Sequence, residues 1–122
     1  MAGATQVVLG LLFWSGRAYA LLPLHMLIGM TLVIALWVLA GLAARAGLRS
    51  RWVLAALTWG IIVPAFGVIH PQLLPGAAHW VVRIIHLLIG VAAMVIAMRL
   101  AGYIRSRRQP ARAAAADVLS AA

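Results

Sequence analysis

The sequence predicts an all-α integral membrane protein, a helical bundle of three transmembrane helices preceded by a short N-terminal apolar helix. Hydrophobic residues make up 66% of its 122 residues and charged residues only 9%, a composition typical of a membrane protein rather than a soluble domain. Three apolar runs approach or exceed the length of roughly 20 residues with which a helix crosses a bilayer. Arginine-rich segments follow the first and the third of these runs.

The helices are predicted in order from these runs. The first apolar stretch, residues 7–14, is too short to cross, so we expect an interfacial or half-inserted helix there. It lacks the basic segment of a signal peptide, and we expect it to be retained. The first crossing begins near Pro23, a residue favoured in a first helical turn, and continues to about Ala44.

Two further crossings follow, over residues 52–69 and 78–103. They are joined by an uncharged loop rich in proline and glycine. We therefore expect residues 1–105 to form one transmembrane domain and residues 106–122 to form an Ala/Arg-rich cytoplasmic tail.

The arginines predict the orientation of the bundle. All ten basic residues are arginine, and most lie in two clusters: Arg45, Arg49 and Arg51, and then Arg105, Arg107, Arg108 and Arg112. Because positive charge collects on the cytoplasmic side, both clusters and the C-terminus are predicted inside, with the chain a multi-pass protein of a bacterial-type inner (plasma) membrane. The clusters also suit anionic lipid, and no nucleic-acid binding is expected.

The residues that the chain lacks narrow the chemistry. There is no cysteine, which excludes disulfides, thiolate metal sites and cysteine nucleophiles. The single acid, Asp117, lies in the tail, which excludes paired-carboxylate catalysis and all-carboxylate metal sites. The chain has no room for a catalytic domain, so we expect an electron-transfer or accessory subunit rather than an enzyme acting alone.

An internal repeat relates the first and the third crossing. A shift of 61 residues superimposes 25–42 on 86–103, with seven of eighteen positions identical, and aligns His25 with His86. The two crossings run in the same direction, so the repeat is a parallel one about an axis along the membrane normal. Both histidines are then expected at one depth near the outer face.

Paired imidazoles inside a membrane point to a bound group. Ionisable side chains in lipid are costly and mark functional sites, and two neutral imidazoles that face each other can be the axial ligands of one haem iron. Gly29 and Gly90 lie four residues after the histidines, on the same helix faces, and would leave room for the ring. We therefore predict one haem b, with His25 and His86 as the metal ligands.

The third crossing adds polar side chains along one stripe. His79, Arg83, His86 and Gly90 are spaced by four, three and four residues, which is one face of a helix. Arg83 lies one turn outward of His86 and has no acid nearby in the sequence, so we expect it to bind a haem propionate. His79 is a further candidate for the cofactor site; a solvated loop position is the alternative for His79 and for His70.

This arrangement resembles that of membrane b-type cytochromes and of the small haem-bearing anchor subunits of respiratory dehydrogenases and hydrogenases. The resemblance covers about residues 25–103 and rests on His25, Gly29, Arg83, His86 and Gly90. It implies an electron-transfer subunit within a larger complex or oligomer. Its partners would be a membrane or periplasmic redox subunit and the quinone pool or another haem.

Three other interpretations stay open. The chain can be a cofactor-free structural or assembly subunit, in which the glycines serve close helix contacts. Methionines four residues apart, Met26 with Met30 and Met94 with Met98, are similar to the Met-x-x-x-Met element of copper-uptake channels, although packing explains such spacing as well. Each histidine can also bind its own chlorophyll in a pigment-binding subunit.

Overall fold

Helices account for nearly all of the computed structural model, which describes residues 2–48 and 51–120, with side chains described as far as Gln109. Arg49 and the side chains of Arg112 and Asp117 lie outside the described part. In chain order the helical elements are α1 (Ala2–Trp14), the 3₁₀ turn η1 (Tyr19–Leu21), α2 (Leu22–Arg45), α3 (Arg51–Ile69), the 3₁₀ turn η2 (His70–Gln72) and α4 (His79–Ser120).

Three long helices have the length and apolar composition to cross a membrane, over Tyr19–Arg45, Arg51–Gln72 and His79–Gln109. The shorter apolar helix α1 precedes them. The prediction of three long apolar helices behind a short one is confirmed. Large apolar side chains such as Leu27 and Leu54 are about two-thirds exposed, as expected of surfaces that face lipid rather than water.

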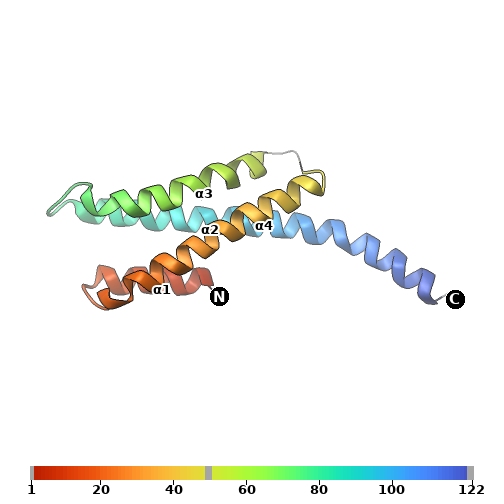
Figure 1. The fold of residues 1–122 in the computed structure, drawn as a ribbon, viewed down its shortest axis with the longest axis horizontal. Coiled ribbons are helices and arrows are strands. Elements are labelled where there is room, and N and C mark those ends of the chain that lie inside the picture. The colour runs from red at the N-terminus through yellow and green to blue at the C-terminus, as the bar shows by residue number, and fades with distance from the viewer. Residues whose placement is uncertain (1, 49–50, 121–122) are drawn as a thin grey trace.

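The helices α2 and α4 run in the same direction, and α3 runs in the opposite direction between them in the sequence (Figure 1). This direction agrees with the parallel relation predicted between the repeats 25–42 and 86–103. We call the end where α2 and α4 begin and α3 finishes the histidine end. The opposite end, where α2 finishes and α3 begins, is the arginine end.

A short turn folds α1 back along the first half of α2 (Figure 1). The turn needs left-handed backbone at Gly16, with φ of 76°, and at Ala18, with φ of 62°. The phenol of Tyr19 donates a hydrogen bond to the carbonyl oxygen of Phe13 at 3.1 Å, and the two rings stack. These contacts hold α1 against the bundle at the histidine end.

The buried core lies in the half of the bundle toward the arginine end. Ala40 and Ala43 of α2, Ala56 of α3 and Leu100 of α4 have no exposed surface. Such small residues let helix backbones approach closely. A Cβ at Gly60 would collide with the indole of Trp37, so the close packing continues toward the middle of the bundle.

The last helix continues without a break across the predicted boundary between 1–105 and 106–122. Its backbone is helical from His79 to Ser120, so no helix end falls between residues 105 and 106. The division into a membrane domain and a cytoplasmic tail therefore stays a prediction and does not coincide with the end of a helix.

Candidate functional site

All four histidines of the chain meet at the histidine end. Their rings lie next to one another in a row. The ring centres are 6.4 Å apart for His25 and His86, 4.9 Å for His86 and His70, and 6.0 Å for His70 and His79. They come from α2, η2 and α4. We call these four side chains the histidine cluster.

The predicted pair His25 and His86 faces across the bundle from α2 to α4. Their ring planes are inclined by 40°, and both side chains are half-buried. The Nδ1 atom of each ring is buried and has no hydrogen-bond partner. Buried polar atoms without partners are rare in folded proteins because each one costs free energy. In both rings, therefore, the same nitrogen atom lacks a hydrogen-bond partner.

Two phenylalanines enclose the pair. Phe13 of α1 meets the ring of His25 edge-on at 5.3 Å between ring centres. Phe66 of α3 stacks on His86 at 5.9 Å, with the ring planes inclined by 24°. Each imidazole therefore has one phenylalanine ring as a direct neighbour, from α1 for His25 and from α3 for His86.

Backbone carbonyls hold the other two histidines. Nδ1 of His70 lies 3.0 Å from the Gly67 oxygen, and Nδ1 of His79 lies 3.0 Å from the Leu73 oxygen. A ring that donates from Nδ1 leaves Nε2 as a free acceptor or ligand. The position of His70 beside His86 was not predicted, because η2 directly follows the second crossing and its fold against α4 cannot be read from sequence spacing.

The two matched glycines have different surroundings. A Cβ at Gly29 would lie 2.8 Å from the side-chain nitrogen of Gln6, whereas a Cβ at Gly90 would meet nothing within 4 Å. Gln6 of α1 donates a hydrogen bond from this nitrogen to the His25 carbonyl oxygen at 2.9 Å. The space that was predicted for a cofactor at Gly29 is therefore occupied by an amide, and only Gly90 borders open space.

Gln6 is a site residue that the sequence analysis missed. Its Oε1 atom is buried without a partner, as are the Nδ1 atoms of His25 and His86. Glutamine in a short apolar stretch is a weak signal, although it is the only strongly polar side chain of α1. Its contact with α2 depends on how α1 folds back, which the sequence does not specify.

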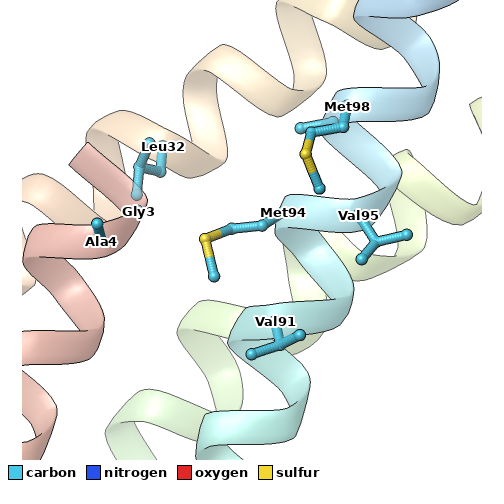
Figure 2. A pocket seen from close by; sticks show the side chains of 8 residues that line it. Gly3, Ala4, Leu32, Val91, Met94, Val95 and Met98 are labelled. Atoms are coloured by element: carbon cyan, nitrogen blue, oxygen red, sulfur yellow. The ribbon is translucent and has the colours of Figure 1, made fainter. Parts of the chain in front are cut away.

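An apolar groove lies deeper in the bundle, between α1, α2 and α4. Its volume is about 360 Å³, and its lining residues are Gly3, Ala4, Leu32, Val91, Met94, Val95, Ala97 and Met98. Figure 2 shows the side chain of Met94 extending from α4 toward Gly3 and Ala4 of α1. The groove begins five residues beyond His86, about one and a half helical turns deeper at 1.5 Å per residue.

The methionine pairs are divided between the groove and the outer surface. Met94 and Met98 line the groove. Met26 and Met30 are not part of its lining and are 59% and 50% exposed. A copper pathway made from all four thioethers would therefore need more than one copy of the chain.

Arg83 has a protein partner at the histidine end. Its guanidinium donates a hydrogen bond to the carbonyl oxygen of Trp14, the last residue of α1, at 3.4 Å. Carbonyls at a helix C-terminus carry partial negative charge, so they suit a cation. The contact uses one of five guanidinium N–H groups, which leaves donors for an anion.

The number of potential metal ligands that come together can be compared with what different metal groups need. Within the described residues, no three histidine, cysteine or carboxylate side chains are placed to hold one metal ion. Structural zinc normally has four protein ligands, whereas a haem iron with paired histidines has two.

No family model, curated protein or solved structure matches this chain. The function of the chain is therefore inferred from the geometry of the histidine end.

Proposed function

We propose that the chain is a small cytochrome b-like membrane subunit that binds one haem b near the outer membrane face and transfers electrons within a larger redox complex. The observation that carries the proposal is the distance of 6.4 Å between the ring centres of His25 and His86. Two imidazoles that bonded one metal centre from opposite sides, each through a nitrogen at about 2.0–2.1 Å, would have their ring centres roughly 6 Å apart.

The surroundings of the pair support the same proposal. Gly90 borders open space one turn from His86, and the groove beyond it is lined by apolar side chains, which suit a macrocycle. A metal centre between the rings would also bond one nitrogen of each buried imidazole. The position beside Gly29 is filled by the side chain of Gln6. For the haem ring to lie there, α1 would have to move.

Each site residue has a defined part in this proposal. When bound, a haem supplies one-electron redox chemistry. His25 and His86 would hold the iron as neutral imidazoles, and the ring contacts of Phe13 with His25 and of Phe66 with His86 would limit how the imidazoles turn. Arg83 has guanidinium donors beyond the one that bonds Trp14, and these would neutralise a propionate.

The partners follow from the position of the site. A haem near one end of the bundle cannot by itself carry electrons across the bilayer, so another redox subunit in the membrane or periplasm, and a quinone or a second haem, complete the path. The arginine end would face the cytoplasm, because Arg45, Arg51, Arg105 and Arg107 gather there. This orientation gives a multi-pass protein of a bacterial-type inner membrane with a cytoplasmic C-terminus.

The test is a reduced-minus-oxidised absorption spectrum of the purified protein, followed by a hemin titration of the haem-free chain. We expect a Soret band and saturation at one hemin per chain. His25→Ala and His86→Ala should each abolish the six-coordinate spectrum, because each removes one axial ligand.

His79→Ala is the comparison variant, since it removes a histidine of the same cluster that the proposal does not use as an axial ligand. It should keep the spectrum. A His70→Ala variant tests the other close pair, because the His70 ring lies 4.9 Å from His86. If His70→Ala abolishes the spectrum and His25→Ala does not, the ligand pair is not the one proposed. A chain that binds no hemin would favour a cofactor-free structural subunit, and extraction of chlorophyll would favour the pigment alternative.

A further inference from the structure

The arginine end carries a large excess of positive charge. Six arginines of the described part lie there: Arg45, Arg51, Arg99, Arg105, Arg107 and Arg108. The whole sequence contains one acidic residue, so side chains of this chain cannot balance that charge. The compensating anions must come from outside the chain.

Two of these arginines meet over one indole. The guanidinium carbon of Arg51 lies 5.7 Å from the centre of the Trp52 ring, and that of Arg99 lies 5.9 Å from it. These distances are within the range of cation–π contacts. Arg51 and Trp52 begin α3, whereas Arg99 belongs to α4, so the indole brings cations of two neighbouring helices together.

Arg99 is unusual because its position is within an apolar helix segment. Arg99 lies inside an apolar span, between the apolar residues Met98 and Leu100. Tyr103, one turn further along α4, donates a hydrogen bond to the Ala46 carbonyl oxygen at 3.5 Å and so marks the level of the turn that follows α2. A charge one turn inside that level is costly unless its long side chain reaches a polar partner.

Each of the two guanidiniums carries five N–H donors. Neither Arg51 nor Arg99 has a hydrogen-bond acceptor or an ion-pair partner among the residues that the structure describes. Both are exposed at the surface of the bundle. A guanidinium that rests on an aromatic face keeps its N–H edge free, and that edge matches two oxygens of a phosphate.

We propose that Arg51, Trp52 and Arg99 form a binding site for the phosphate of an anionic lipid headgroup. The site faces the region where lipid headgroups meet the bundle, and its two cations come from different helices, as in basic sites between transmembrane helices. The indole supplies a flat amphipathic surface at the same level. The lipid would neutralise Arg99 and join the start of α3 to α4. This site does not depend on the histidine cluster.

The test uses the purified full-length chain in mild detergent, with bound lipid measured by native mass spectrometry. Phosphatidylglycerol is the anionic probe and phosphatidylcholine the zwitterionic one. We expect the protein to retain phosphatidylglycerol preferentially. Loss of an arginine that binds the phosphate should weaken retention about five-fold, so Arg51→Gln combined with Arg99→Gln should weaken it about 25-fold in all.

Arg105→Gln is the matched control, because it removes the same charge from α4 while Arg105 bonds the Ala101 carbonyl oxygen and not the indole. It should change retention less than two-fold. Equal loss in this control, equal retention of both lipids, or equal occupancy by inorganic phosphate alone would overturn the proposal. If the double variant loses helical circular dichroism, Arg99→Lys decides: it keeps the charge but loses the planar donor edge, so retention should fall, and unchanged retention would overturn the site.

Discussion

The two ends of the bundle differ in how completely their buried side chains are packed and hydrogen-bonded by the chain itself. Toward the arginine end, α2, α3 and α4 each contribute a fully buried residue to one core cluster: Ala40, Ala56 and Leu100. At the histidine end, the buried Nδ1 atoms of His25 and His86 have no partner. The comparison separates two tasks: one half of the molecule is packed and supplies stability, whereas the other half holds polar groups that the chain leaves incomplete.

The largest expected effect comes from adding hemin to the histidine end. A ligand present at 1,000 times its dissociation constant stabilises the folded state by about 4 kcal/mol, and His86→Ala should lose this gain. Without hemin, His86→Ala should unfold close to the wild-type temperature, because the ring lies outside the buried core. Thermal unfolding with and without hemin measures both. Equal stabilisation of His86→Ala by hemin would mean that hemin binds elsewhere.

A smaller effect is expected from overfilling the packed half. Ala43→Leu places a larger side chain at a position with no exposed surface, and it should cost about 1–3 kcal/mol of folding free energy. Ala44→Leu is the matched control, since Ala44 is its exposed neighbour on α2. The melting temperatures should separate the two variants. If they melt together, the packed half does not supply the stability that the comparison assigns to it.

The matched glycines should respond differently to one methyl group. At Gly90 the methyl meets nothing, so Gly90→Ala should gain up to about 1 kcal/mol from helix propensity without hemin, yet bind hemin more weakly. At Gly29 the methyl would meet the Gln6 amide 2.8 Å away, so the gain should be reduced or reversed. Unfolding and hemin titration of both variants check this. Unchanged hemin affinity in Gly90→Ala would argue against a ring beside Gly90.

The smallest effect is expected at Gln6. Gln6→Leu removes both a buried oxygen without a partner and a hydrogen bond to the His25 carbonyl. Removing the oxygen without a partner should raise the stability of the fold, whereas losing the hydrogen bond should lower it. The free energy of unfolding should therefore change by less than about 1 kcal/mol. Thermal unfolding of the haem-free variant measures it. A destabilisation as large as that of Ala43→Leu would show that α1 contributes to the core more than its contacts indicate.

The sequence predicted the helices because each depends on a local property. A run of apolar residues long enough to cross a bilayer specifies a helix whatever surrounds it, and the predicted starts near Pro23, residue 52 and residue 78 lie close to those of α2, α3 and α4. The meeting of His25 and His86 was also predictable, because two crossings in the same direction bring matched positions to one depth.

The contacts made by irregular segments could not be predicted. His70 reaches His86 because η2 folds inward after α3, and Arg83 reaches Trp14 because α1 turns back. Both depend on turns whose geometry spacing does not encode. The pairing of Arg99 with Trp52 was missed for a related reason, since the rotation of α3 relative to α4 decides which side chains meet.

The indole nitrogen of Trp59 donates a hydrogen bond to the Ile89 carbonyl oxygen at 2.9 Å and joins α3 to α4 midway along the bundle. Trp37 makes a longer contact of 3.4 Å from α2 to the Leu57 carbonyl oxygen. Nearer the start of α2, Gln6 of α1 donates a hydrogen bond to the His25 carbonyl oxygen. The two tryptophans therefore tie α3 to both of its neighbours in mid-bundle, whereas the part of α2 that carries His25 is bonded to α1 through Gln6.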